Sequence, residues 1–201
     1  MISRAVDTKT RILDAAEKLF GQNGFDATSL RDITAEAEVN LAAVNYHFQS
    51  KESLIDAVVA RRVEPVNQKR LEMLEAAGPN PTLEQLLIAF LQPLMQSDLA
   101  QVYPLMARLL ATPDAFLTRL FKKHLSLIIE RFSEAFSQAL PECDATQIRW
   151  KMQFTAGAMA HVLSRAYAMP ELMPDVKFDS QTVLAELVTF AAAGFRAKEG
   201  I

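Results

Sequence analysis

Cysteine is almost absent from this chain. Cys143 is the only one among 201 residues, so the chain can form no internal disulfide and no cysteine-based metal cluster. Glycine is also scarce, with six residues, and strong helix breakers are sparse between residues 82 and 200. This scarcity favours long helices over many short strands.

Long apolar runs are missing as well. No stretch reaches the roughly 18 uncharged apolar residues that indicate a membrane-spanning helix. Residues 1–20 contain Asp7, Asp14 and Glu17 and lack the apolar segment of a signal peptide. We therefore expect a soluble, cytoplasmic protein with no membrane partner.

Charge of one sign is not in excess. The formal net charge is −3, and residues 1–62 hold eight Lys or Arg against nine Asp or Glu. DNA-binding domains often carry a basic excess, so a DNA-binding surface here must gather its positive charge locally. Hydrophobic residues make up 50% of the chain, enough for a sizeable buried core.

Hydrophobic periodicity predicts an all-α fold of about nine helices. Capping residues mark five N-termini, and Pro65 is expected to kink or end the fourth helix. The expected caps are Asp7, Ser29 with Asp32, Asn40, Ser50, and Thr82 with Gln85. The expected helices cover residues 7–23, 29–37, 40–48, 50–77, 82–96, 99–111, 113–140, 145–168 and 180–197.

Residues 28–48 fit a helix-turn-helix, two short helices joined by a turn of three or four residues. The alternative is an ordinary helical hairpin without a DNA role. The outer face of the second helix favours DNA, because it is small, polar and uncharged where a merely solvated face usually carries Lys and Glu. Small residues allow close approach to base edges, and Asn45 can pair with adenine through two hydrogen bonds.

Three segments resemble the signature of the TetR family of transcriptional regulators over about residues 8–60. They are Thr28-Ser29-Leu30-Arg31-Asp32-Ile33, then Val39-Asn40, then Tyr46-His47-Phe48-x-Ser50-Lys51-Glu52-Ser53-Leu54-Ile55. The resemblance implies a second helix that reads bases and phosphate contacts around it. The expected DNA-binding residues are Thr28, Ser29, Arg31, Leu41, Ala42, Ala43, Asn45, Tyr46, His47 and Lys51.

The resemblance also implies the domain plan. Residues 1–55 would form a three-helix DNA-binding domain, and residues 56–201 a helical domain for effector binding and dimerisation. The family often has glycine where this chain has Glu38, because the turn needs a positive φ, so Glu38 is expected in a left-handed conformation. His47 has no metal-ligand partner at a suitable spacing, so a phosphate contact or a packing role is expected instead.

Polar residues embedded in apolar helices indicate an effector site in the C-terminal domain. The alternative for each is a structural role as a snorkelling or salt-bridged side chain. Arg108, His161 or Arg165 would meet the polar or anionic end of an elongated apolar effector, such as a fatty acid or an acyl thioester. The expected apolar lining is Phe90, Leu94, Met106, Leu110, Phe121, Leu125, Phe154 and Ala158. Residues 39–48 also resemble those of a TetR subgroup that contains fatty-acid-responsive regulators.

Small residues and phenylalanines on the last two helices predict a homodimer interface, with tight packing inside one chain as the alternative. The expected interface residues are Gly157, Ala160, Phe190, Ala191 and Gly194. A twofold dimer would match a palindromic operator in double-stranded DNA.

The function predicted from the sequence is a repressor that a small apolar effector releases from its operator. One alternative is a DNA-binding regulator that needs no effector. An enzyme is disfavoured, because the sequence shows no nucleophile with a nearby base, no metal-ligand spacing and no phosphate-binding loop. We therefore expect no catalytic residue, no metal and no cofactor.

Overall fold

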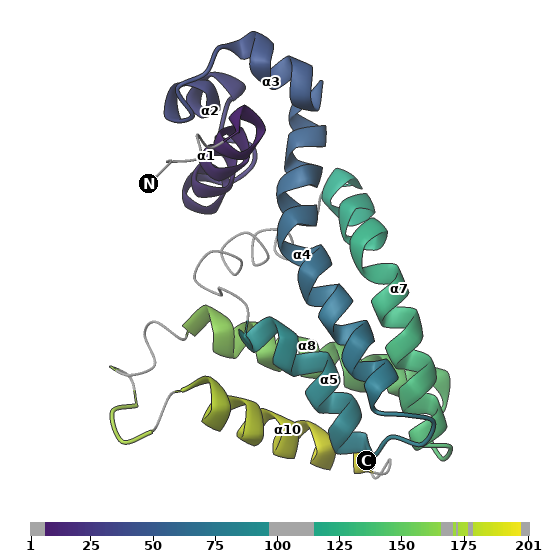
Figure 1. Cartoon of the computed structure of the whole chain (residues 1–201). Helices are drawn as coiled ribbons and strands as arrows, with labels where there is room; N and C mark the ends of the chain where they lie inside the picture. Colours follow the sequence, from purple (N-terminus) through teal and green to yellow (C-terminus); the bar gives the residue numbers. More distant parts are fainter. Residues whose placement is uncertain (1–6, 97–114, 166–170, 172, 177–178, 198–201) are drawn as a thin grey trace, which may run out of the picture. The chain divides into compact units, whose positions relative to one another are not determined.

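The computed structural model describes residues 7–96, 115–165, 171, 173–176 and 179–197, and these residues form eight helices (Figure 1). The helices are α1 (Thr8–Asn23), α2 (Leu30–Glu36), α3 (Leu41–Phe48), α4 (Lys51–Ala76), α5 (Leu83–Gln96), α7 (Ala115–Ala139), α8 (Ala145–Arg165) and α10 (Ser180–Arg196). The all-α prediction is confirmed, with eight helices in this part of the chain where nine were expected overall. The helix expected at 99–111 lies outside the described residues.

The chain divides into two compact units, and the boundary falls inside α4, between Glu64 and Pro65. The first unit includes α1, α2, α3, α4 up to Glu64 and α7 up to Leu120. The second includes the rest of α4, α5, α7 from Phe121, α8 and α10. None of the described helices is long and apolar enough to cross a membrane.

Local side-chain caps begin most of the helices, as the sequence predicts. Ser29 and Asp32 form a reciprocal capping box at α2, and the Asn40 side chain accepts from the Ala43 amide at 2.8 Å. Asp7 is the exception, because its side chain accepts no capping hydrogen bond; its main-chain oxygen accepts from the Arg11 amide instead. Asp7 is therefore the N-cap residue as predicted, but without a capping hydrogen bond from its side chain.

Helix α4 continues through Pro65, so the expectation that this proline could end the helix is wrong. Val63 and Val66 on either side of the proline are both buried. Burial of apolar side chains on both sides stabilises the helix against the hydrogen bond that the proline removes.

Aromatic rings form much of the core of the second unit. The Phe132 ring lies 5.1 Å from that of Phe90, and the Phe136 ring lies 4.7 Å from that of Phe195. These contacts join α5, α7 and α10, and α10 also packs against α5 and α8. Tilted ring pairs at such distances are favourable packing geometries.

Candidate nucleic-acid interface and C-terminal sites

The turn between α2 and α3 sets the direction of α3. Glu38 has φ 50°, so the predicted left-handed conformation is confirmed. The Arg11 guanidinium of α1 holds this turn by donating to the main-chain oxygens of Ala37 at 2.6 Å and Glu38 at 3.0 Å. A cation at the carboxyl end of a helix satisfies its free carbonyls, so Arg11 positions α3. The sequence analysis did not identify this role of Arg11.

The carboxyl end of α3 is fixed by a second unusual residue, Gln49. Its φ is 63° and its ψ −41°, and the Ser50 amide lies 2.6 Å from the Phe48 oxygen. This is close to a γ-turn of the rare type that is strained for residues with a side chain. The turn leads α3 directly into α4.

Helix α3 has one buried and one exposed face. Val44 and Phe48 are buried, whereas Ala42, Asn45 and Tyr46 are exposed, Tyr46 by 83%. The exposed face thus combines small and polar side chains with one aromatic ring, a composition that allows a helix to approach base edges in a DNA groove.

Ion pairing separates the cations of the first unit into two groups. Four are neutralised in salt bridges, namely Arg11–Glu38, Lys18–Glu36, Arg61–Asp14 and Arg62–Glu17. Lys9, Arg31 and Lys51 form no salt bridge with any residue that the structure describes. Lys9, Arg31 and Lys51 are therefore the cations of α1, α2 and the start of α4 that remain available for phosphate contacts.

Thr28 is a correction to the predicted DNA contacts. Its side chain is fully buried, and its hydroxyl donates to the oxygens of Gly24 at 2.8 Å and Leu19 at 3.2 Å. Thr28 therefore secures the segment after α1 and cannot present its side chain to DNA. Among the other predicted residues, Ser29, Arg31 and Leu41 are exposed, and Ala43, His47 and Lys51 are half-buried.

Lys9 is an addition that the sequence analysis missed. It lines a small surface pocket of about 260 Å³ together with His47, Gln49 and Ser53. The pocket brings a lysine from α1 beside the predicted phosphate contact His47. Spacing along the sequence could not have shown this, because the two residues lie in different helices.

The residues predicted to bind the effector differ in how far they are buried. Phe90 is buried, and Leu94, Phe121, Leu125 and Ala158 are half-buried. Met106, Arg108 and Leu110 lie outside the described residues, and so does the side chain of Arg165.

Phe154 and His161 face outward on α8, so an enclosed cavity that both residues reach does not form among the described residues, and their contact with an effector stays a prediction. Phe154 is 66% exposed, and His161 is exposed as well. They share one helical face with Trp150 and Gly157, since these four positions follow intervals of four, three and four residues. Both faces of α8 are apolar, so periodicity alone does not show which one is buried.

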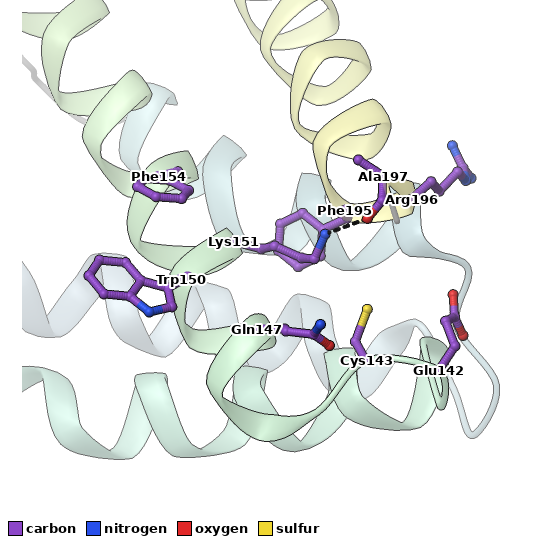
Figure 2. Close-up of a pocket in the computed structure, with 9 residues that line it drawn as sticks. All are labelled: Glu142, Cys143, Gln147, Trp150, Lys151, Phe154, Phe195, Arg196 and Ala197. Atoms are coloured by element: carbon purple, nitrogen blue, oxygen red, sulfur yellow. Dashed lines mark hydrogen bonds between the residues drawn. The ribbon is translucent and has the colours of Figure 1, made fainter. Parts of the chain in front are cut away.

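An open surface pocket of about 730 Å³ lies between α8 and the end of α10 (Figure 2). Trp150 and Phe154 stack along one side with ring centroids 5.6 Å apart. Lys151 donates to the main-chain oxygens of Gly194 at 2.8 Å and Ala197 at 3.1 Å, which closes the end of α10.

Three of the five residues predicted for the dimer interface, Gly157, Phe190 and Gly194, are exposed, and Ala160 is half-buried. Phe190 is 68% exposed, and a Cβ added at Gly157 or Gly194 would meet no atom within 4 Å. Ala191 is buried within the chain, so its placement in an interface between chains is wrong. It lies on the face of α10 that carries Leu187 and Phe195, both also buried.

Arg70 is a buried cation that the sequence analysis missed. It is 6% exposed, and its guanidinium lies 4.8 Å from the centroid of the Phe90 ring. Burial lowers the pKa of Arg70 to about 10, so it stays charged at neutral pH. In the sequence it is one of several Arg and Lys residues in the same helix, and nothing in the pattern distinguishes it as the buried one.

Comparison with protein families gives two matches. Residues 12–58 match the profile of bacterial regulatory proteins of the tetR family, and residues 88–194 match the tetracyclin repressor-like C-terminal domain. YttP of Bacillus subtilis is 38% identical over 86 residues, which are 41% of this chain and 40% of that protein. The HTH-type transcriptional repressor BepR of Brucella suis is 29% identical over 102 residues, 50% of this chain and 49% of that one. The chain thus spans about two fifths to one half of the curated relatives it matches.

Solved structures match over nearly the whole chain. GusR of Salmonella enterica superposes with a TM-score of 0.69 at 22% identity, covering 98% of this chain and 99% of that one. The fatty acid degradation regulator FadR of Bacillus halodurans gives 0.71 at 17% identity, covering 98% and 100%. At these identities the likeness establishes the fold.

Proposed function

Because the chain belongs to the TetR family, we propose that it is a transcriptional regulator that binds operator DNA through α3. The observation that carries the proposal is the exposed face of α3, with Ala42, Asn45 and Tyr46, in a unit where Lys9, Arg31 and Lys51 form no salt bridge with a described residue. A helix of this kind can enter the major groove while the cations contact phosphates. In this proposal residues 1–55 are the DNA-binding domain and residues 56–201 the effector and dimerisation domain.

The contacts divide into two roles. Asn45, Ala42 and Arg31 read base edges, because they are exposed and Asn and Arg can each make paired hydrogen bonds to a base. Lys51, Tyr46 and Lys9 hold the phosphate backbone, which gives affinity without sequence preference.

Selection of duplexes from a randomised library tests the proposal. The wild-type protein should enrich one palindromic sequence. Asn45→Ala should cost about 1–3 kcal/mol on that sequence and little on random DNA. Lys51→Ala should weaken both alike. No enrichment by the wild-type protein would refute the function, and an unchanged preference in Asn45→Ala would refute the role of Asn45.

The proposed assembly is a homodimer through α8 and α10. Trp150, Phe154, Phe190 and the two open glycines support it, because this surface is apolar and allows close helix approach. A twofold dimer presents two copies of α3, which is the arrangement that a palindromic operator matches.

The proposed control is release from DNA by a small apolar effector with one anionic end. The fatty acid regulator among the similar folds supports this choice of ligand class. Release requires that the effector bind one conformation more tightly than the other. The competing proposal is a regulator without an effector, and it predicts that no apolar acid changes operator affinity.

A further inference from the structure

The guanidinium of Arg70 is held in a fixed orientation inside the second unit. Its Nε donates to the Phe90 oxygen at 2.8 Å, and its Nη1 donates to Asn67 Oδ1 at 3.3 Å. The Asn67 Nδ2 donates in turn to the His124 oxygen at 2.7 Å. Arg70 is therefore linked to α5 directly and to α7 through Asn67.

The positive charge of Arg70 forms no salt bridge with a carboxylate of any described residue. The two acceptors of Arg70 are a main-chain oxygen and an amide, both neutral, whereas every salt-bridged arginine in the described residues lies nearer the surface. The pKa of Arg70 is lowered by burial alone, with no carboxylate to raise it. A guanidinium has five N–H groups, so two hydrogen bonds leave donors available. A buried cation in this state is costly, and an anion beside it would lower that cost.

We propose that Arg70 binds the carboxylate of the effector, with Asn67 and the Phe90 ring holding the guanidinium in place. This inference rests on the proposed release by a small molecule and names the residue that recognises the ligand. A single charge fits a carboxylate, because a phosphate dianion would bring one unbalanced charge into the buried site. The planar fork of Arg70 matches the two oxygens of a carboxylate.

A purely structural role makes a different prediction. If Arg70 served only to link α4 to α5, then its removal would destabilise the protein and leave ligand preference unchanged. If it is an anion site, the preference for a carboxylate should vanish in the folded variant, whatever the change in melting temperature. Thermal melting and ligand binding together separate the two roles.

Titration of the full-length protein with dodecanoate and with 1-dodecanol, followed by calorimetry, tests the proposal. The two probes share a chain and differ in the charge of the head. The wild-type protein should bind dodecanoate about tenfold to a hundredfold more tightly. Equal affinities for the two probes, or no binding of dodecanoate, would overturn the proposal. Because both probes are tested on the wild-type protein, this comparison does not depend on whether a variant folds.

Variants then assign the effect to one residue. Arg70→Met should bind both probes alike and remain on the library-selected operator at dodecanoate concentrations that release the wild-type protein. Arg70→Lys, which keeps the charge without the fork, should retain part of the preference. Lys69→Met, at the exposed neighbouring position, is the matched control and should behave as the wild-type protein. A carboxylate preference that survives in folded Arg70→Met would contradict the proposal.

The outcome also separates this inference from the proposed function. Operator selection measures DNA binding without any ligand. If selection succeeds and dodecanoate does not bind, then only the role of Arg70 fails. If selection fails, then the proposed function fails whatever the ligand result.

Discussion

Two single residues with positive φ, Glu38 and Gln49, flank helix α3 and fix its two ends. Glu38 could be predicted, because the family resemblance places a glycine there. Gln49 could not be, since glutamine carries no preference for this conformation and its strain arises from the close succession of α3 and α4. The sequence thus predicted one of the two positive-φ residues that flank α3 and not the other.

Gln49→Gly should keep or raise the melting temperature, because glycine relieves a strain of about 1–3 kcal/mol that outweighs its greater freedom when unfolded. Gln49→Val should lower it, since a branched side chain fits this conformation worst. Circular dichroism during heating measures both. Gln68→Gly, at an exposed position inside α4, is the control and should destabilise by about 1 kcal/mol. Equal losses in the two glycine variants would show that Gln49 is unstrained.

Among the helices, those with local caps were predicted best. The boxes at Ser29 and Thr82 lie within three residues of sequence and need no knowledge of the tertiary fold. The outward face of α8 was not predictable, because Phe154 and Met152 are both apolar and only packing decides which one is buried. The continuation of α4 through Pro65 depends on packing in the same way.

The capping box of α2 should make part of the stability depend on pH. Hydrogen bonds from the Ser29 hydroxyl and amide hold the pKa of Asp32 below its ordinary 3.8. A lowered pKa means that the contribution is complete above 3.8 and is lost as the pH falls through the lower folded value. Asp32→Asn should therefore melt with a weaker dependence on pH in the acid range. Asp26→Asn, which removes another exposed carboxylate of the first unit, should keep the wild-type dependence, and an identical profile in both variants would exclude the effect.

The surface of α8 and α10 gives a prediction about assembly. Gly194→Glu should fold, because Gly194 is exposed and an added Cβ has open space around it, and should be monomeric, because it places charge in the proposed interface. Analytical ultracentrifugation at micromolar concentration distinguishes the two states. Gln181→Glu, exposed in the first turn of α10, is the matched control and should remain dimeric. A wild-type monomer, or a dimeric Gly194→Glu, would rule out this interface.

At the scale of the whole molecule, net charge is a poor guide to function. The chain has a formal net charge of −3, yet Arg11, Lys18, Arg61 and Arg62 are salt-bridged whereas Lys9, Arg31 and Lys51 are in no salt bridge with a described residue. Sequence counts could not reveal this, because salt bridges such as Arg62–Glu17 join residues far apart in the chain.

Operator affinity should consequently fall steeply with salt despite the negative net charge. Lys9→Ala and Lys51→Ala should each reduce the slope of log affinity against log salt by about 1, because each removes one phosphate contact. Fluorescence anisotropy between about 50 and 200 mM salt measures the slope. Lys18→Ala is the control, since Lys18 is paired with Glu36. A slope that changes as much in Lys18→Ala would place the phosphate contacts elsewhere.

The helix caps also bear on how the chain folds. Six of the described helices begin with a side chain that binds a main-chain amide two or three residues ahead, at Ser29, Asn40, Ser50, Thr82, Asp144 and Asp179. Closing so short a loop costs little chain entropy, so each helix can start before distant segments meet. Contacts between residues far apart in the sequence, such as the salt bridge of Glu84 with Arg196, form only when α5 and α10 come together. The folding rate is therefore set by the search for these long-range pairings, while helix initiation is a fast and local event.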